Sequence, residues 1–357
     1  MSRAATTTAT DLRGLSFPCG DPPAVADARE VLPGLLWLRM PLPFALDHIN
    51  LWALREDDGW AVVDSGTQTP PTLAAWHALL ASGGALGGRP ITRVIATHMH
   101  PDHIGMAGWL TRKFDCRLWM TRDEYLMGRT LTADTGRTAP ADAIRFYRRC
   151  GWPEEALDLY RARFGDFGKF VHELPDSYRR IVDGEHFRIG AHEWRVVVGR
   201  GHSPEHACLV CDELQVLISG DQVLPRISSN VSVFPTEPEA DPLREWLESI
   251  AHLRAQLPDT LLVLPAHGEP FRGLHARLER LAQGHANGLV RLTRALAEPR
   301  RVVDVFGALF ARSVDLHSGQ LGLATGETMA HLNLLLTRGE IEVTEGDDGV
   351  WRWCARR

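Results

Sequence analysis

Few lysines, no long apolar run and no clustered cysteines characterise this sequence of 357 residues. No segment approaches the roughly 18 apolar residues that a membrane-spanning helix needs. Residues 1–11 are rich in alanine and threonine and lack the apolar centre of a signal peptide. The six cysteines are scattered, as reduced cysteines of a cytoplasmic protein are. We therefore expect a cytoplasmic protein with no membrane partner. Lysine occurs only at Lys113 and Lys169, which indicates a coding bias rather than a function.

The two nearest cysteines, Cys208 and Cys211, lie within a segment that has the composition of a strand. Alternation along a strand directs residues three apart to opposite faces. We therefore interpret this pair as two small side chains of the hydrophobic core.

Composition and charge are those of a soluble globular protein, with 44% hydrophobic and 24% charged residues. The net charge of -6 gives no general attraction to nucleic acid or to an anionic membrane. The length exceeds that of one ordinary domain, which predicts a large domain and a small one.

Three histidines and a carboxylate lie within six consecutive positions, as His98, His100, Asp102 and His103. The residues just before them have the β-branched composition of a short strand, and residues 105–114 have the apolar spacing of a helix. The cluster is therefore expected on a loop at the end of a strand, where α/β proteins bind their ligands. Neutral imidazole and carboxylate suit borderline divalent ions such as zinc, so we predict a metal site. The alternative is a histidine-rich surface turn.

Three more residues of ligand type each follow an apolar strand, and these are His202, Asp221 and His267. A twisted sheet brings the ends of such strands together, so the four loops are expected to meet. The residues divide between two ions: His98, His100 and His202 for the first, Asp102, His103 and His267 for the second, and Asp221 as a bridge. Two ions roughly 3.5–4 Å apart can share a water and lower its pKa.

The pattern His98-x-His100-x-Asp102-His103, followed by His202, Asp221 and His267, resembles that of the metallo-β-lactamase fold hydrolases over residues 31–290. The resemblance implies an α/β fold, a four-layer αβ/βα sandwich, with a site for two divalent metal ions. These ions are usually Zn²⁺, with iron or manganese as alternatives. In the mechanism it implies, Asp102 is catalytic, because it orients the attacking water and receives its proton.

Three further residues are candidates for supporting that site. Asp64 matches the early aspartate of the family, which typically holds the metal ligands from outside; the alternative is a turn aspartate. Glu205 replaces a glycine that many relatives carry, and it adds a carboxylate near the site. His206 supports the ligands or contacts substrate, with a packed loop histidine as the plainer alternative.

Three domains are predicted: an N-terminal arm over residues 1–30, a catalytic domain over 31–290 and a C-terminal domain over 291–357. A helical insertion at about 123–180 interrupts the sheet pattern of the catalytic domain. Its aromatic residues form either an apolar wall of the substrate site, which would accept an acyl chain, or a packing or homodimer surface.

The C-terminal domain resembles the winged-helix-like domain of one branch of the same family, the β-lactamase-like protein 2 type. The resemblance depends on the order of helices and hairpin and on residues 324–332. A winged helix that binds DNA has a basic recognition helix. Residues 328–337 are instead largely apolar, and the hairpin carries four acidic side chains that would repel phosphate. We therefore expect a packing or pocket-shaping role for this domain, and a small-molecule substrate in preference to a nucleic acid.

These observations predict a metal-dependent hydrolase that attacks a small or medium ester, thioester or lactone with hydroxide from a dinuclear site. A single-strand RNA endonuclease is one alternative, because the same metal pair can activate water against a phosphodiester. A redox enzyme of the same fold with one iron is another. A non-catalytic binding module would be expected to lack ligands, and none is missing.

Overall fold

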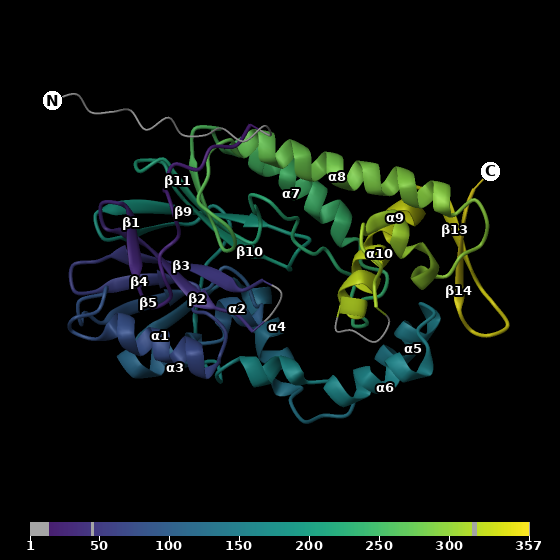
Figure 1. The fold of residues 1–357 in the computed structure, drawn as a ribbon, viewed down its shortest axis with the longest axis horizontal. Helices are drawn as coiled ribbons and strands as arrows, with labels where there is room; N and C mark the ends of the chain where they lie inside the picture. Colours follow the sequence, from purple (N-terminus) through teal and green to yellow (C-terminus); the bar gives the residue numbers. More distant parts are fainter. Residues whose placement is uncertain (1–13, 44–45, 316–319, 357) are drawn as a thin grey trace.

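The computed structural model describes residues 14–43, 46–315 and 320–356, and it contains two β-sheets that lie face to face (Figure 1). The first sheet has the order β1-β2-β3-β4-β5-β6-β7. Its strands are β1 (Ala28–Leu32), β2 (Leu35–Pro41), β3 (His48–Arg55), β4 (Trp60–Val63), β5 (Ile91–Ile95), β6 (Arg117–Met120) and β7 (Arg179–Arg180). Strands β1 to β4 pair antiparallel, and β4 to β7 pair in parallel.

The second sheet has the order β12-β11-β10-β9-β8. Its strands are β8 (His186–Ile189), β9 (His192–Gly199), β10 (His206–Cys211), β11 (Val216–Gly220) and β12 (Leu262–Pro265). Cys208 and Cys211 are both buried on β10, and they belong to different hydrophobic clusters on the two faces of this sheet. The interpretation of this pair as core side chains on opposite faces is therefore confirmed.

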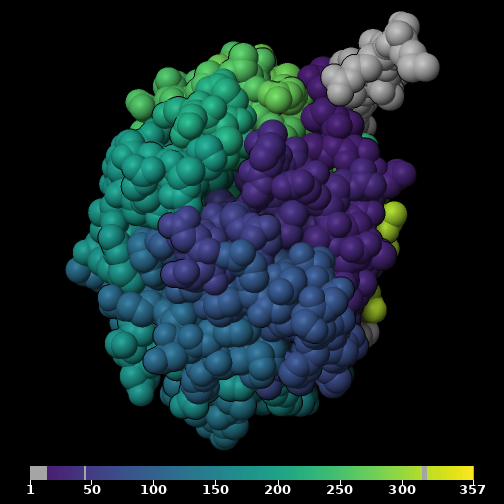
Figure 2. All heavy atoms as spheres, turned by 90° about the vertical axis from the view of Figure 1, so that its left-hand side faces the viewer, coloured from purple at the N-terminus to yellow at the C-terminus, as the bar shows by residue number. Residues whose placement is uncertain are grey.

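Helices cover the outer face of each sheet and complete four layers. The space between the sheets is filled by one cluster that joins Trp37 and Trp52 of the first sheet to Trp194 of the second. Outside the first sheet lie α1 (Pro70–Leu80) and α3 (Ala107–Phe114), and outside the second lie α7 (Pro242–Gln256) and α8 (Leu274–Ala295). The expected αβ/βα sandwich is confirmed. Figure 2 shows the purple and blue N-terminal half packed against the teal and green half.

The sequence of α1 shows why these helices form where they do. Thr69 caps the helix by accepting a hydrogen bond from the N–H of Thr72, and Pro70 begins it with a preset φ. The buried residues Ala75, Trp76 and Leu79 then recur at helical spacing and face the sheet. Helix α7 begins in the same way, with Asp241 as its cap and a proline next to it.

The helical insertion lies between β6 and β7 and comprises α4 (Arg122–Ala133), α5 (Ala141–Arg149), α6 (Glu154–Arg163) and the 3₁₀ helix η1 (Asp166–Phe170). Its aromatic residues Phe146, Tyr147 and Trp152 are buried in the same cluster as Trp353 near the C-terminus. The indole N–H of Trp152 donates a hydrogen bond of 2.9 Å to the hydroxyl of Thr325. These aromatic side chains therefore pack against the C-terminal domain, which favours the packing alternative over an apolar substrate wall.

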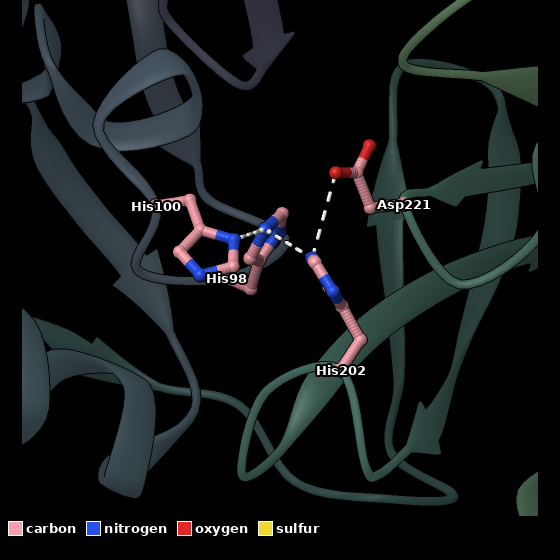
Figure 3. Close-up of side chains that lie close together, drawn as sticks. All are labelled: His98, His100, His202 and Asp221. Atoms are coloured by element: carbon pink, nitrogen blue, oxygen red, sulfur yellow. Dashed lines mark hydrogen bonds and ion pairs between the residues drawn. The ribbon is translucent and has the colours of Figure 1, made fainter. Parts of the chain in front are cut away.

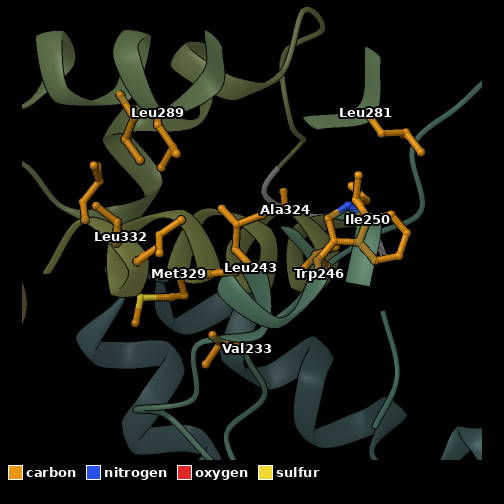
Figure 4. Close-up of a cluster of buried hydrophobic side chains, with 14 of the residues drawn as sticks. Val233, Leu243, Trp246, Ile250, Leu281, Leu289, Ala324, Met329 and Leu332 are labelled. Atoms are coloured by element: carbon orange, nitrogen blue, oxygen red, sulfur yellow. The ribbon is translucent and has the colours of Figure 1, made fainter. Parts of the chain in front are cut away.

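The C-terminal domain comprises the 3₁₀ helix η2 (Val302–Val305), α9 (Phe306–Leu309), α10 (Gln320–Thr337) and a hairpin of β13 (Ile341–Glu345) and β14 (Trp351–Ala355). Its central helix α10 packs against α7 and α8 through buried apolar side chains (Figure 4). A small domain with a two-stranded sheet is therefore confirmed, whereas its likeness to a winged helix stays a prediction.

Three details differ from the sequence expectation. Strand β1 begins at Ala28, inside the expected arm. It lies at the edge of the sheet and pairs only with β2, so its residues are partly polar and the sequence does not mark them as a strand. The sequence pattern predicts a helix over residues 327–338, but α10 begins earlier, at Gln320, since burial of Leu321 and Ala324 outweighs the helix-weakening glycines of this segment. The predicted boundary at 290/291 falls within α8, and the division into domains stays a prediction.

None of the helices among the described residues has the length and apolarity to span a bilayer.

Candidate metal centre

All seven predicted ligands lie in segments that follow strands, at one edge of the two sheets. His98 and His100 are in the loop after β5, and Asp102 and His103 are in the short helix α2 (Pro101–Ile104) that follows. The sequence predicts a loop as far as residue 105. In the structure, Pro101 occupies the first helical position and starts a short turn of helix. The other ligands come directly or within three residues after β9, β11 and β12, and these are His202, Asp221 and His267.

The first set of ligand atoms is formed by His98, His100, His202 and Asp221 (Figure 3). Nε2 of His98 lies 2.8 Å from Nδ1 of His100 and 3.2 Å from Nε2 of His202. Oδ2 of Asp221 lies 3.5 Å from Nε2 of His202. These atoms all lie within 4.8 Å of one another, and three nitrogens with one carboxylate oxygen match the ligands that zinc prefers.

The second set is formed by Asp102, His103 and His267. Oδ2 of Asp102 lies 3.6 Å from Nε2 of His103 and 3.3 Å from Nε2 of His267. The other oxygen of Asp221, Oδ1, lies 3.7 Å and 3.4 Å from the same two nitrogens. Asp221 therefore directs one oxygen to each set, which is the position predicted for it.

Two buried atoms of this arrangement have no hydrogen-bond partner among the described residues, namely Nε2 of His103 and Oδ1 of Asp221. An unpaired buried polar atom is costly, and a group that binds there would have to satisfy both. A cation fits this requirement, because both atoms offer lone pairs. The residues present therefore fit a bound metal ion.

The second nitrogens of three ligand histidines, His98, His202 and His267, are held by the surrounding chain. Nδ1 of His202 donates to the backbone oxygen of Asn230 at 2.7 Å, and Nδ1 of His267 donates to the backbone oxygen of His48 at 2.8 Å. Nδ1 of His98 contacts the hydroxyl of Thr97 at 3.0 Å. Each contact fixes the tautomer that leaves Nε2 free for a metal.

Asp64 holds His103 in the same way, with 2.8 Å between its Oδ2 and Nδ1 of His103. Its Oδ1 accepts the N–H of Thr97 at 2.8 Å. The residue is 2% exposed and has a φ of 64°, a region that aspartate tolerates better than most side chains. The structure thus places Asp64 behind His103, where it can support the ligand.

His206 and Glu205, the other two predicted supporting residues, have different surroundings. The buried ring of His206 stacks on that of His98 with 4.7 Å between centroids, and its Nε2 accepts the N–H of Asp221 at 3.0 Å. The carboxylate of Glu205 instead accepts the N–H of Asp123 at 3.2 Å, in the first turn of α4. Glu205 therefore contacts a helix end and not the ligand atoms.

Glu124 is a buried residue that the sequence analysis missed. Its carboxylate accepts the N–H of Met99 at 2.9 Å and the N–H of Glu205 at 2.8 Å. It thereby joins the loop of His98 and His100 to the loop of His202. In the sequence it is one of two adjacent acids at a helix start, a common feature of exposed helices, so no local signal marks it.

The charges in the site favour metal binding by the first set. Burial lowers the pKa of His98 well below its usual value and that of His100 to about 3, so both imidazoles are neutral at pH 7. Burial opposes ionisation of Asp102, but His103 and His267 outweigh it and lower the pKa of that carboxyl to about 2. Burial also lowers the pKa of His103, but Asp64, Asp102 and Asp221 outweigh it and raise it, so a metal would have to displace a proton there.

A groove with a volume of 590 Å³ lies beside His202. Its apolar lining includes Met99, Met127 and Phe234. Its charged lining has five carboxylates and two arginines: Asp123, Glu237, Glu239, Asp241 and Glu245, with Arg200 and Arg244. Arg244 already pairs with Asp241 at 3.3 Å, so the groove presents a surplus of negative charge.

Comparison with known proteins agrees with this geometry. Residues 45–267 match the Metallo-beta-lactamase superfamily, and residues 289–356 match the Metallo-beta-lactamase-like, C-terminal domain. The crystal structure of a Beta-lactamase domain protein from Burkholderia ambifaria is 42% identical, with a TM-score of 0.86, and the match covers 96% of this chain and 98% of that one.

Two relatives with functional names are more distant. The "Probable metallo-hydrolase YqjP" of Bacillus subtilis is 24% identical over 311 residues, which are 84% of this chain and 91% of the relative. An "Atrochrysone carboxyl ACP thioesterase" of Aspergillus fumigatus is 23% identical over 236 residues, which are 66% of this chain but only 41% of the thioesterase. From the family match over most of its length, the fold and the ligand geometry, we conclude that this chain belongs to the metallo-β-lactamase superfamily and is a metal-dependent hydrolase.

Proposed function

We propose that this enzyme hydrolyses a small or medium carboxylic ester, thioester or lactone at a site for two divalent ions, with zinc as the first choice. The observation that carries the proposal is the position of Asp221, whose Oδ2 is 3.5 Å from Nε2 of His202 and whose Oδ1 is 3.4 Å from Nε2 of His267. A carboxylate between two sets of nitrogens suits a bridged pair of ions better than a single one.

The ions would supply a water of lowered pKa and an electrophile for the carbonyl oxygen of the substrate. The chain supplies the geometry and the proton acceptor. Asp102 lies at the centre of the second set and is ionised at neutral pH, so its carboxylate can orient a water and take up a proton. Asp221 keeps the two sets in fixed relation, because it contacts both.

The groove beside His202 supports a carbonyl substrate over a nucleic acid. Its surplus of carboxylates would repel a chain of phosphates. Several arginines of the insertion that could form a basic face are paired with acids; for example, Arg145 lies 2.9 Å from Asp142 and Arg148 lies 3.1 Å from Glu154. The apolar side chains of the groove would instead contact an acyl group or a thiol arm.

The name of the Aspergillus relative adds support for a thioester within this class. That support is limited by the 41% of the relative that the match covers, so the proposal includes esters and lactones equally.

The test combines elemental analysis with turnover of thioesters, aryl esters, lactones and a single-stranded RNA. We expect about two zinc ions per chain and hydrolysis of at least one carbonyl substrate, with His100→Ala and Asp221→Ala losing activity by orders of magnitude. His186→Ala is the control, because this exposed histidine lies on β8 and is not in either ligand set. Metal-dependent RNA cleavage with inert esters would favour the nuclease instead. One bound iron without any hydrolysis would favour the redox enzyme.

A further inference from the structure

We propose that Glu327, on α10 of the C-terminal domain, is a positioning residue for the metal ligand His202 and acts through Asn230. The inference rests on the proposed function only in that His202 is taken to bind a metal. It assigns the C-terminal domain a part in building the site.

The contacts run from α10 to the ligand in two steps. Oε2 of Glu327 accepts a hydrogen bond of 2.8 Å from Nδ2 of Asn230. The backbone oxygen of Asn230 accepts the hydrogen bond of 2.7 Å from Nδ1 of His202. Glu327 therefore fixes the residue whose carbonyl sets the ring orientation and the tautomer of His202.

The segment that contains Asn230 is held by α10 together with Arg277 of α8, which donates hydrogen bonds to the backbone oxygens of Leu224 and Ile227. Residues 221–241 form neither helix nor strand, so no ladder of backbone hydrogen bonds holds them. Helix α10 holds them at further points; for example, the oxygen of Gly326 accepts the N–H of Val233 at 3.0 Å, and Nδ2 of Asn333 donates to the oxygen of Pro238 at 2.9 Å. Two groups of α10 contact Asn230 itself, the carboxylate of Glu327 at 2.8 Å and the backbone oxygen of Leu323 at 3.4 Å. Glu327 makes the shorter of these contacts and the one that comes from a side chain.

The helix approaches this segment more closely than most side chains would allow. A Cβ atom added to Gly326 would lie 2.6 Å from Oγ of Ser232 and 2.9 Å from the oxygen of Val233. Only glycine fits at that distance, so Glu327 is brought to Asn230 by direct contact of helix and segment. Burial of Glu327 raises the pKa of its carboxyl to about 7, as expected for a group held away from water.

The test uses metal binding and not activity. We would measure zinc affinity of the full chain by competition with a chromophoric chelator and record the visible spectrum of the cobalt(II)-substituted protein. Glu327→Ala is expected to weaken the ion held by His202 by about tenfold and to change the cobalt spectrum, because partners outside the ligand shell typically contribute 10–100-fold. Glu327→Gln is expected to restore both, since its amide oxygen can still accept the hydrogen bond from Asn230.

The matched control is Thr325→Val on the same helix. Thr325 is buried and bonds to the indole of Trp152, so its loss perturbs α10 without touching Asn230. It is expected to lower stability and leave zinc affinity unchanged. Wild-type affinity and spectrum in Glu327→Ala would overturn the inference while leaving the proposed function intact, as would an equal loss of affinity in the control. A wild-type chain that binds no metal would overturn both.

Discussion

Replacing Asp64 by asparagine would test how the centre holds His103. The carboxylate of Asp64 accepts hydrogen bonds of 2.8 Å from the N–H of Thr97 and 2.8 Å from Nδ1 of His103. An amide offers one acceptor oxygen, so in either orientation its NH₂ group meets another donor. Asparagine tolerates a φ of 64° as aspartate does, so the backbone has no reason to change.

The expected loss follows from which contact is broken. The N–H of Thr97 cannot change its role, so the amide oxygen is expected to face it and the NH₂ group to face His103. The imidazole must then move its proton to Nε2, the atom that would bind the metal. Loss of such a partner typically weakens metal binding 10–100-fold, or about 1.4–2.7 kcal/mol.

Chelator competition together with metal stoichiometry would measure this effect. We expect one ion to stay at wild-type affinity in the set that contains His202, and the other to bind 10–100-fold more weakly. Asp115→Asn is the matched control, because Asp115 also has a positive φ, of 49°, but lies on the surface at the end of α3. Two ions at wild-type affinity in Asp64→Asn would refute the reasoning.

Three other predictions concern stability and can be checked by urea unfolding. Glu124→Gln places an NH₂ group against a buried backbone N–H and should cost about 1–3 kcal/mol; an unchanged midpoint would contradict the role given to this carboxylate. Thr325→Val leaves the indole N–H of Trp152 unpaired and should cost a similar amount; wild-type stability in this variant would show that the hydrogen bond does not stabilise the fold. Burial lowers the pKa of both His285 and His331 to about 4, so the unfolded chain binds more protons between pH 6.5 and 4 and these groups reduce stability as the pH falls. His285→Gln should flatten that dependence, and an identical pH profile would show that the pair does not titrate this way.

The candidate ligands could be predicted from the sequence because each carries a local signal. A histidine or aspartate directly after an apolar strand is visible in the chain, and the geometry of sheets brings such positions to one edge. All seven predicted ligands lie in the two sets, and His202 is among them although it is about a hundred residues from His98. Periodicity predicted individual strands and helices, whereas the four-layer arrangement was implied only by the resemblance to the metallo-β-lactamase family.

The supports of those ligands could not be predicted, because most of them are backbone atoms. The oxygens of Asn230 and His48 orient two histidines, yet any residue type could supply a carbonyl there. Glu124 resembles an ordinary exposed acid until its helix is placed between two loops. For the aromatic residues of the insertion, the sequence shows their apolar character but not what they contact. The surface they pack against is formed by residues that come much later in the chain.

The continuity of α8 has a consequence for any attempt to divide this chain. The helix runs unbroken from Leu274 to Ala295, and its Leu278 and Leu292 belong to one buried cluster that extends from the second sheet to the C-terminal hairpin. A truncation near residue 290 would cut the helix and expose part of that cluster to solvent, so the shortened product should aggregate. A gene fusion or an expression library therefore has to keep the chain intact from the first sheet to the final hairpin.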